Sequence, residues 1–109
     1  MWTYDKALAI ARVYVDNATD GRGVVLEDET LDRPYGWVFF YQDRQYLETA
    51  DIRHACAGNA PIIFNCLSGE YHVTGTAQPL EHYLREYEAT LPAVTLEMSP
   101  QFRKPRAAG

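Results

Sequence analysis

The chain has 109 residues, of which 47% are hydrophobic and 13% aromatic, as expected for one globular domain with an ordinary core. The net charge is −5, and all 15 acidic side chains but only 7 of the 10 basic ones lie in residues 1–100. Such an acidic body argues against nucleic-acid binding and favours a basic partner, or none. No apolar run could span a membrane and no secretory signal is visible, so we expect a cytoplasmic protein without a membrane partner.

The first predicted element is an amphipathic helix from Thr3 to about Ala18. Its apolar side chains recur at intervals of three and four residues, as one face of a helix requires: Tyr4, Ala7, Leu8, Ala11, Tyr14, Val15 and Ala18. Thr3 is a suitable N-cap. The range Gly23–Thr30 then indicates a strand that leaves the core and becomes acidic as it does so.

The centre of the sheet is predicted at Tyr35–Tyr41, a continuous aromatic and apolar run that contains Trp37. Because the run is too short for a buried helix and rich in strand formers, we expect a central strand with Trp37 in the core. The polar ranges on either side, Thr30–Pro34 and Gln42–Gln45, are expected to be a loop and a turn. Tyr46–Glu48 could then return as a short strand.

A hairpin is predicted from Pro61–Cys66 to Glu70–Thr76. A two-residue loop would place Phe64 opposite Val73, on an apolar face that also carries Cys66. The other face is mostly polar and is expected to be uncovered: Ile63, Asn65, Leu67, Glu70, His72 and Thr74.

The last third of the chain predicts a second helix and a short strand. Asp51–Ala57 allows one or two helical turns, and an amphipathic helix should begin at Pro79. The alternation of Val94–Met98 favours a short edge strand. Residues 1–98 should therefore form one α+β domain, an antiparallel sheet of about four strands with the N-terminal and C-terminal helices packed on one face. Residues 99–109 are expected to be a flexible basic tail.

Candidate catalytic and metal-binding groups are few. His54 and Cys56 lie near Asp51, but closeness in sequence is weak support for a thiol nucleophile with its base. A zinc site built from His54, Cys56, Cys66 and His72 is disfavoured, because the hairpin puts Cys66 and His72 on opposite faces. The glycines after the first helix are too few for a phosphate-binding loop. We expect no catalysis, no metal and no cofactor, and we expect both cysteines to be buried thiols.

Several short motifs occur in a characteristic order along the chain. They are Pro34 to Phe40, then Gly58 to Pro61 leading into Ile62 and Ile63, then Ser68, Gly69, Gly75 and Thr76, and finally a helix with Tyr83 and Tyr87. In this order the chain resembles the immunity protein 35 family of bacterial polymorphic toxin systems. The resemblance implies an antitoxin that binds and neutralises a cognate toxin. A relative of the same domain type has been regarded as a small chaperone, so a chaperone or peptide-binding module is the alternative.

The candidate partner-binding residues fall into three groups. The densest acidic cluster would steer a basic contact surface of the toxin, unless it is only solvated surface: Glu27, Asp28, Glu29 and Asp32. Tyr35 and Tyr46 lie near strand ends and belong either to the rim of the core or to an interface, where tyrosine is enriched. The polar sheet face contributes Asn65, Glu70 and His72.

Overall fold

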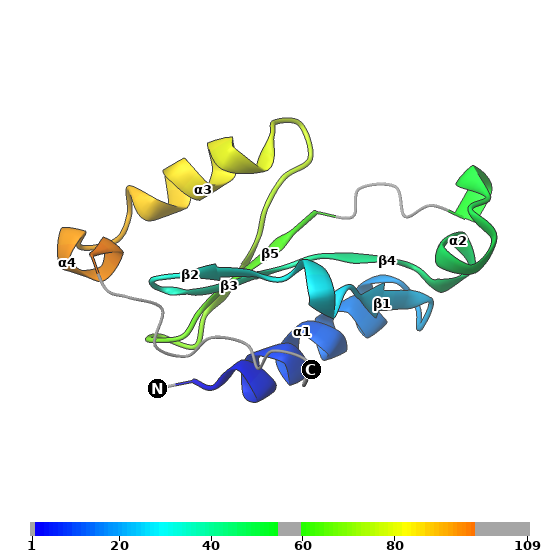
Figure 1. The fold of residues 1–109 in the computed structure, drawn as a ribbon, viewed down its shortest axis with the longest axis horizontal. Helices are drawn as coiled ribbons and strands as arrows, with labels where there is room; N and C mark the ends of the chain where they lie inside the picture. Colours follow the sequence, from blue (N-terminus) through cyan, green and yellow to red (C-terminus); the bar gives the residue numbers. More distant parts are fainter. Residues whose placement is uncertain (1, 55–59, 98–109) are drawn as a thin grey trace.

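The computed structural model describes residues 2–54 and 60–97. The helices are α1 (Tyr4–Ala18), α2 (Arg44–Thr49), α3 (Leu80–Glu88) and α4 (Ala93–Leu96), with 3-10 turns η1 (Glu27–Glu29) and η2 (Ile52–His54). The strands are β1 (Gly23–Val25), β2 (Leu31–Arg33), β3 (Gly36–Phe39), β4 (Tyr41–Asp43), β5 (Ile62–Asn65) and β6 (Tyr71–Val73). They form a four-stranded antiparallel sheet in the order β2-β3-β5-β6 and a two-stranded ribbon of β1 and β4 (Figure 1). The predicted α+β class is confirmed.

Helix α1 lies where the sequence pattern predicts it. The hydroxyl of Thr3 caps its first turn by accepting a hydrogen bond from the amide of Lys6 at 3.3 Å. At the other end, the hydroxyl of Thr19 donates to the carbonyl of Val15 at 2.6 Å and accepts from the amide of Gly23 at 2.7 Å. One buried side chain therefore both closes α1 and positions the start of β1.

Strand β3 is one of the two central strands of the larger sheet, because it pairs with both β2 and β5. Trp37 lies opposite Phe64, and Val38 lies opposite Ile63. Since consecutive side chains on a strand point to opposite faces, Trp37 and Phe64 share one face while Val38 and Ile63 share the other. The expected central strand is confirmed, although it ends at Phe39 and the chain continues as β4.

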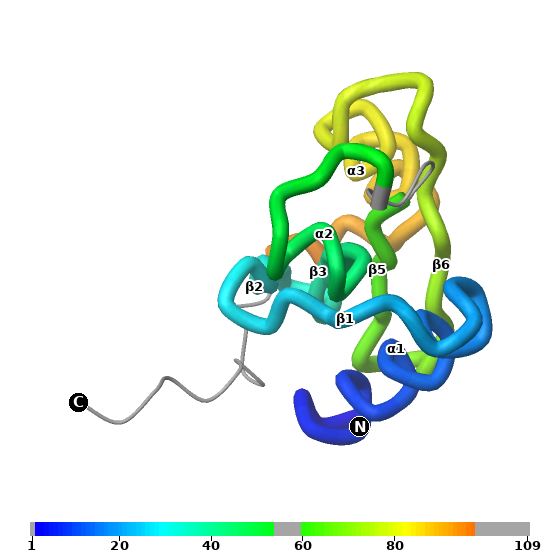
Figure 2. Tube along the Cα trace, turned by 90° about the vertical axis from the view of Figure 1, so that its right-hand side faces the viewer, coloured from blue at the N-terminus to red at the C-terminus, as the bar shows by residue number. Residues whose placement is uncertain are grey.

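The two longest helices cover opposite faces of this sheet, so the expectation that both pack on one face is wrong. Helix α1 packs on the face that carries Trp37 and Phe64, whereas α3 packs through Leu84 on the face of Val38 and Ile63. Figure 2 shows the strands between α3 above and α1 below. The polar sheet face that we expected to be uncovered is therefore the face on which α3 lies.

The hairpin of β5 and β6 differs from the expected register by two residues. Phe64 lies opposite Tyr71, not opposite Val73. The loop is longer than two residues because the side-chain oxygen of Asn65 accepts hydrogen bonds from two backbone amides of the turn, at 2.8 and 3.1 Å. A slip of two residues preserves the alternation of a strand, so the apolar face was assigned correctly.

Three local expectations are also wrong. The segment Thr30–Pro34 contains the edge strand β2 and is not a plain loop, and Tyr46–Glu48 lies in α2 and not in a strand. Val94 and Leu96 belong to α4, which begins directly after Pro92.

Other expectations are met in part or fall outside the described ranges. The helical turn expected in Asp51–Ala57 is present as η2, and residues 55–57, Cys56 among them, lie outside the described residues. Met98 and the expected tail of residues 99–109 lie outside them too.

Replacing Trp37 by Ala should lower the free energy of unfolding by about 3–5 kcal/mol, because truncating a large core aromatic leaves a cavity. Trp37 is 1% exposed, and its ring centroid lies 5.7 Å from that of Tyr4 and 6.4 Å from that of Phe64. Urea unfolding followed by circular dichroism measures the loss. The control Val94→Ala, at a side chain that is 67% exposed, should change stability by no more than about 0.5 kcal/mol. Equal losses in the two variants would contradict the core position of Trp37.

Candidate partner-binding surface

The acidic segment forms the 3-10 turn η1, which connects β1 to β2. The amide of Leu26 donates to the carbonyl of Phe40 at 2.7 Å, and the amide of Thr30 donates to the carbonyl of Glu27 at 3.1 Å. Thr30 is buried, whereas all three acids of η1 are exposed. The backbone of the turn is thus held at both ends while its carboxylates lie at the surface.

An ion pair joins this turn to α1. The guanidinium of Arg12 lies 2.6 Å from the carboxylate of Glu27. Both side chains are about half exposed, at 56% and 49%, so the pair adds little to stability. Its role is to orient η1 relative to α1.

Asp32 follows η1 in sequence but has a different environment. It lies on the edge strand β2 opposite Trp37 and is half-buried. Its Oδ1 atom is buried, and none of the described residues donates a hydrogen bond to it. A charge that points inward on an edge strand discourages pairing with another chain. Asp32 is therefore a feature of the sheet edge and not part of the exposed acidic turn.

Helix α2 starts at Arg44 because Asp43 caps it. The carboxylate of Asp43, which is 5% exposed, accepts hydrogen bonds from the amides of Gln45 at 2.8 Å and Tyr46 at 3.2 Å. The helix presents Tyr46 half-buried and Leu47 at 48% exposure.

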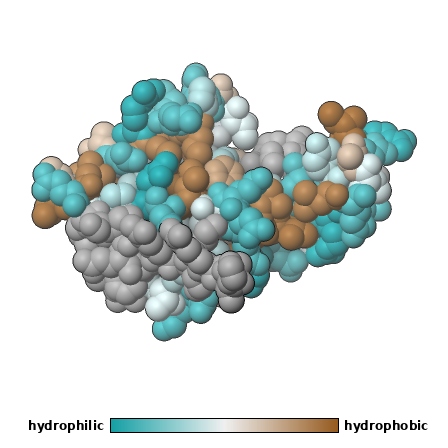
Figure 3. Space-filling model, viewed as in Figure 1, coloured by the Kyte–Doolittle hydropathy of each residue, from teal (hydrophilic) through white to brown (hydrophobic). Residues whose placement is uncertain are grey.

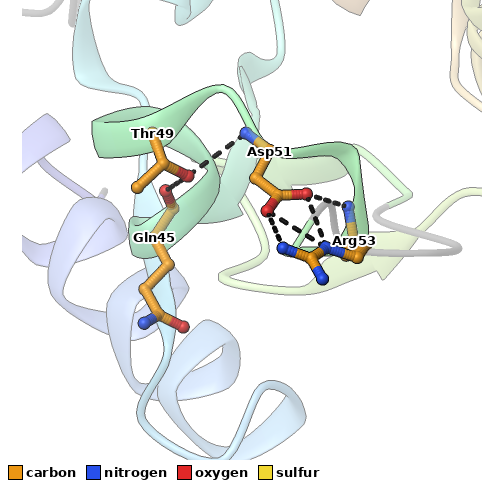
Figure 4. Close-up of polar contacts among 4 residues, drawn as sticks. All are labelled: Gln45, Thr49, Asp51 and Arg53. Atoms are coloured by element: carbon orange, nitrogen blue, oxygen red, sulfur yellow. Dashed lines mark hydrogen bonds and ion pairs between the residues drawn. The ribbon is translucent and has the colours of Figure 1, made fainter.

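Polar contacts fix the bend between α2 and η2 (Figure 4). The hydroxyl of Thr49 donates to the carbonyl of Gln45 at 2.7 Å and accepts from the amide of Asp51 at 3.1 Å. The carboxylate of Asp51 in turn accepts from the amide and the guanidinium of Arg53, at 3.0 and 2.6 Å. Ile52 lies between these two partners and is 81% exposed. The bend thus holds a large apolar side chain in solvent.

A hollow of about 420 Å³ joins the acidic turn to α2. Its lining includes Glu27 of η1, Arg44 of α2 and residues of β1 and α1, among them Val25 and Val13. In Figure 3, hydrophobic atoms are visible toward the end of the molecule that carries α2, and also beneath α3 and at the end that carries α4. We name the three acids of η1, this hollow, Leu47 and Ile52 together the η1–α2 surface.

Tyr35 is 0% exposed, so its side chain cannot contact a partner without unfolding, and we remove it from the candidate set. Its hydroxyl donates to the carboxylate of Glu88 on α3 at 3.0 Å, and its ring lies 5.3 Å from that of Tyr87. Burial, together with the negative charge of Glu88, raises the pKa of Tyr35 far above its usual value. The hydroxyl therefore remains a donor that attaches α3 to the sheet.

The residues expected on the free sheet face have different environments. Asn65 is 5% exposed and its side-chain amide donates to the hydroxyl of Tyr87 at 3.0 Å, so it too is removed from the candidate set. Glu70 and His72 are exposed, and the His72 ring stacks on that of Tyr87 at 5.9 Å. They belong to β6 and its entry, on the opposite edge of the sheet from β2, and thus are not brought together with the acids of η1.

Residues 2–54 and 60–97 contain no cluster of three His, Cys, Asp or Glu side chains that could hold a metal ion. Cys66 is a buried free thiol, as expected, and burial raises its pKa. Within the same residues no helix has the length and apolar character needed to cross a membrane.

Leu47 and Ile52 were not among the candidate contact residues expected from the sequence. The signal for α2 was available, since Asp43 precedes a run of residues compatible with a helix and aspartate is a preferred N-cap. No sequence pattern indicated that Ile52 would be exposed, because its exposure depends on the bend after α2.

The described residues define a small α+β domain whose most prominent exposed groups lie on a turn and a short helix outside the sheet. The chain belongs to the immunity protein 35 family, whose model matches residues 5–89. The family expected from the sequence motifs is thereby confirmed. The chain is also 43% identical over 88 residues to the uncharacterized protein YrhB of Escherichia coli (strain K12), covering 81% of this chain and 90% of YrhB. No solved structure matches the chain.

Replacing Asp43 by Ala should weaken α2, because two backbone amides lose their acceptor; N-cap removal costs about 0.5–2 kcal/mol. Hydrogen exchange followed by mass spectrometry should show faster exchange in residues 44–49, with little change in α1. Asp43→Asn, which keeps an acceptor oxygen at the cap, is the matched control and should exchange nearly as slowly as the natural protein. If both variants exchange equally fast, the negative charge of Asp43 and not its capping geometry maintains the helix.

Proposed function

We propose that this chain is a cytoplasmic, non-catalytic immunity protein of a bacterial polymorphic toxin system, which neutralises a cognate toxin by binding it directly. Membership of the immunity protein 35 family supports an immunity role. The observation that carries the proposed binding mode is the η1–α2 surface, where the carboxylate of Glu27 adjoins a hollow that reaches Arg44 of α2, the helix that carries the exposed side chain of Leu47. Contact inhibition of this kind requires no cofactor and no metal.

The two parts of the η1–α2 surface would contribute to different steps of binding. Exposed carboxylates attract a basic patch over a distance and raise the association rate more than the affinity. Apolar side chains that become buried at the centre of an interface slow dissociation. Glu27–Glu29 would thus steer the toxin, whereas Leu47 and Ile52 would hold it.

Neutralising the acids of η1 should slow binding to the toxin. The variant Glu27→Gln, Asp28→Asn, Glu29→Gln should associate about tenfold more slowly at low salt, because steering by complementary charge changes association rates by at least about that factor. At high salt, where charges are screened, the difference should nearly disappear. Stopped-flow binding to the toxin encoded beside this gene measures the rate. Asp32 is left intact because it is half-buried.

The matched control neutralises three exposed acids elsewhere, Glu81, Glu86 and Glu97, each replaced by Gln. It changes the net charge by the same amount but leaves η1 intact. An equal slowing in both variants would assign the effect to total charge and contradict a contact at η1. Absence of a toxin gene beside this one would contradict the proposed function itself.

Truncating the exposed side chain of Ile52 should weaken the complex by speeding its dissociation. Ile52→Ala should raise the dissociation rate about fivefold or more, the change that corresponds to an interface contact worth over 1 kcal/mol, and leave the association rate almost unchanged. Surface plasmon resonance on the immobilised toxin separates the two rates. Val94→Ala, at 67% exposure against 81% for Ile52, is the control and should dissociate at the natural rate. An unchanged dissociation rate for Ile52→Ala would remove η2 from the interface.

The alternative function is a small chaperone or peptide-binding module. The exposed side chains of Leu47 and Ile52 favour it, because weak binding of many unfolded clients also uses apolar surface. A chaperone would suppress the aggregation of unrelated proteins. An immunity protein would bind one toxin tightly and leave such aggregation unaffected.

A further inference from the structure

The two edges of the four-stranded sheet differ in how they meet solvent. One edge, β2, carries the charged residues Asp32 and Arg33, which is a common protection against pairing with another chain. The other edge, β6, consists of Tyr71, His72 and Val73, and among the described strands it pairs with β5 alone. Strand β6 has no Asp, Glu, Lys, Arg or Pro, so it lacks the usual obstacles to pairing on its outer side.

The hydrogen bonds of the hairpin show which groups of β6 point outward. The amide of Asn65 donates to the carbonyl of Glu70 at 2.8 Å, and the amide of Thr74 donates to the carbonyl of Pro61 at 2.9 Å. In an antiparallel pair, residues alternate between those that bond to the partner strand and those whose backbone groups point away. The amides and carbonyls of Tyr71 and Val73 therefore point to the outer edge.

An apolar groove of about 430 Å³ extends this edge onto α1. It is lined by Ala9, Ile10, Val13, Tyr14, Asn17 and Tyr71. Val13 is 62% exposed and Tyr71 is 48% exposed, while the rings of Tyr14 and Tyr71 lie 5.8 Å apart. Figure 2 shows α1 beneath β6 at one margin of the molecule, so the helix and the strand edge form one surface.

We propose that this surface binds a second copy of the same chain. A two-fold axis perpendicular to the sheet and beside His72 would pair Tyr71 of each copy with Val73 of the other, which uses every outward backbone group of β6. The same axis sets the two α1 helices antiparallel on one face. Val13 and Ile10 of each copy then cover the groove of the other.

The charges along α1 are complementary under this symmetry. Lys6 lies in the first turn of α1, one turn before the groove residue Ile10, and Asn17 lines the groove in the last turn of the helix. The last turn of α1 carries no basic residue, and Asp20 follows the helix. Antiparallel packing brings Lys6 of one copy to the last turn of the other, where a cation is favoured by the helix dipole. An isologous interface requires this kind of self-complementarity.

The proposed dimer and the η1–α2 surface share Val13, which lines both the groove and the hollow. Strand β6 and strand β2 lie at opposite edges of the sheet, and η1 connects to β2. The acids of η1, Leu47 and Ile52 do not line the groove, and the dimer does not depend on the proposed function.

Sedimentation velocity of the full chain, from micromolar to submillimolar concentration, tests the dimer. The natural protein should show a concentration-dependent dimer. Val13→Glu should weaken it by about a hundredfold, because two carboxylates would be buried in the groove. Val94→Glu makes the same chemical change at a valine of similar exposure, 67% against 62%, and should still dimerise. Thermal melting of each variant checks that the fold is retained.

A charge exchange tests the antiparallel arrangement of the helices. Lys6→Glu and Asn17→Lys should each weaken the dimer, whereas the double variant should restore it through a Glu–Lys pair between copies. A natural protein that is monomeric at every concentration would overturn the proposal, as would equal weakening by Val13→Glu and Val94→Glu. A double variant no better than the single ones would overturn the proposed geometry. A monomer whose groove binds the toxin would show that the occupant is the partner and not a second copy.

Discussion

The close approach of β3 to β5 at Gly36 is the constraint on which the rest of the fold depends. Gly36 has a φ of +150°, and a Cβ atom there would lie 1.9 Å from the carbonyl oxygen of Phe64. Only glycine meets both conditions, because other residues rarely adopt this backbone and have no room for a side chain. At this position the chain departs from the regular alternation of a strand. Tyr35 and Trp37, two residues apart, consequently lie in different hydrophobic clusters.

That departure explains how a sheet of short strands is covered on both faces. Trp37 packs with α1 on one side, while Tyr35 reaches the other side and donates its hydroxyl to Glu88 of α3. Tyr87 of α3 also accepts a hydrogen bond from Asn65 and stacks on His72. A polar sheet face can thus be buried, because the hydroxyl of Tyr35 finds an acceptor in the carboxylate of Glu88 and the amide of Asn65 finds one in the hydroxyl of Tyr87.

These contacts also show why sequence analysis succeeded for some elements and failed for others. Periodicity identified α1, the central strand and the apolar face of the hairpin, since each depends on a local pattern of burial. It could not show that α3 lies on the face of Asn65 and His72. Polar side chains give the same sequence pattern whether they form hydrogen bonds with water or with a buried tyrosine. The register of the hairpin was missed for a related reason, since the side chain of Asn65 enlarges the turn.

The candidate site was predicted in its charged part and missed in its apolar part. The acids of η1 were visible as a cluster in the sequence, whereas the exposure of Ile52 arises from the bend that Thr49, Asp51 and Arg53 maintain. Apart from the ion pair of Glu27 with Arg12, both parts are attached to the domain by interactions that do not involve the proposed contact side chains. Backbone hydrogen bonds hold η1, and Asp43 holds α2. The residues of η1, Leu47 and Ile52 could therefore change at little cost to the core.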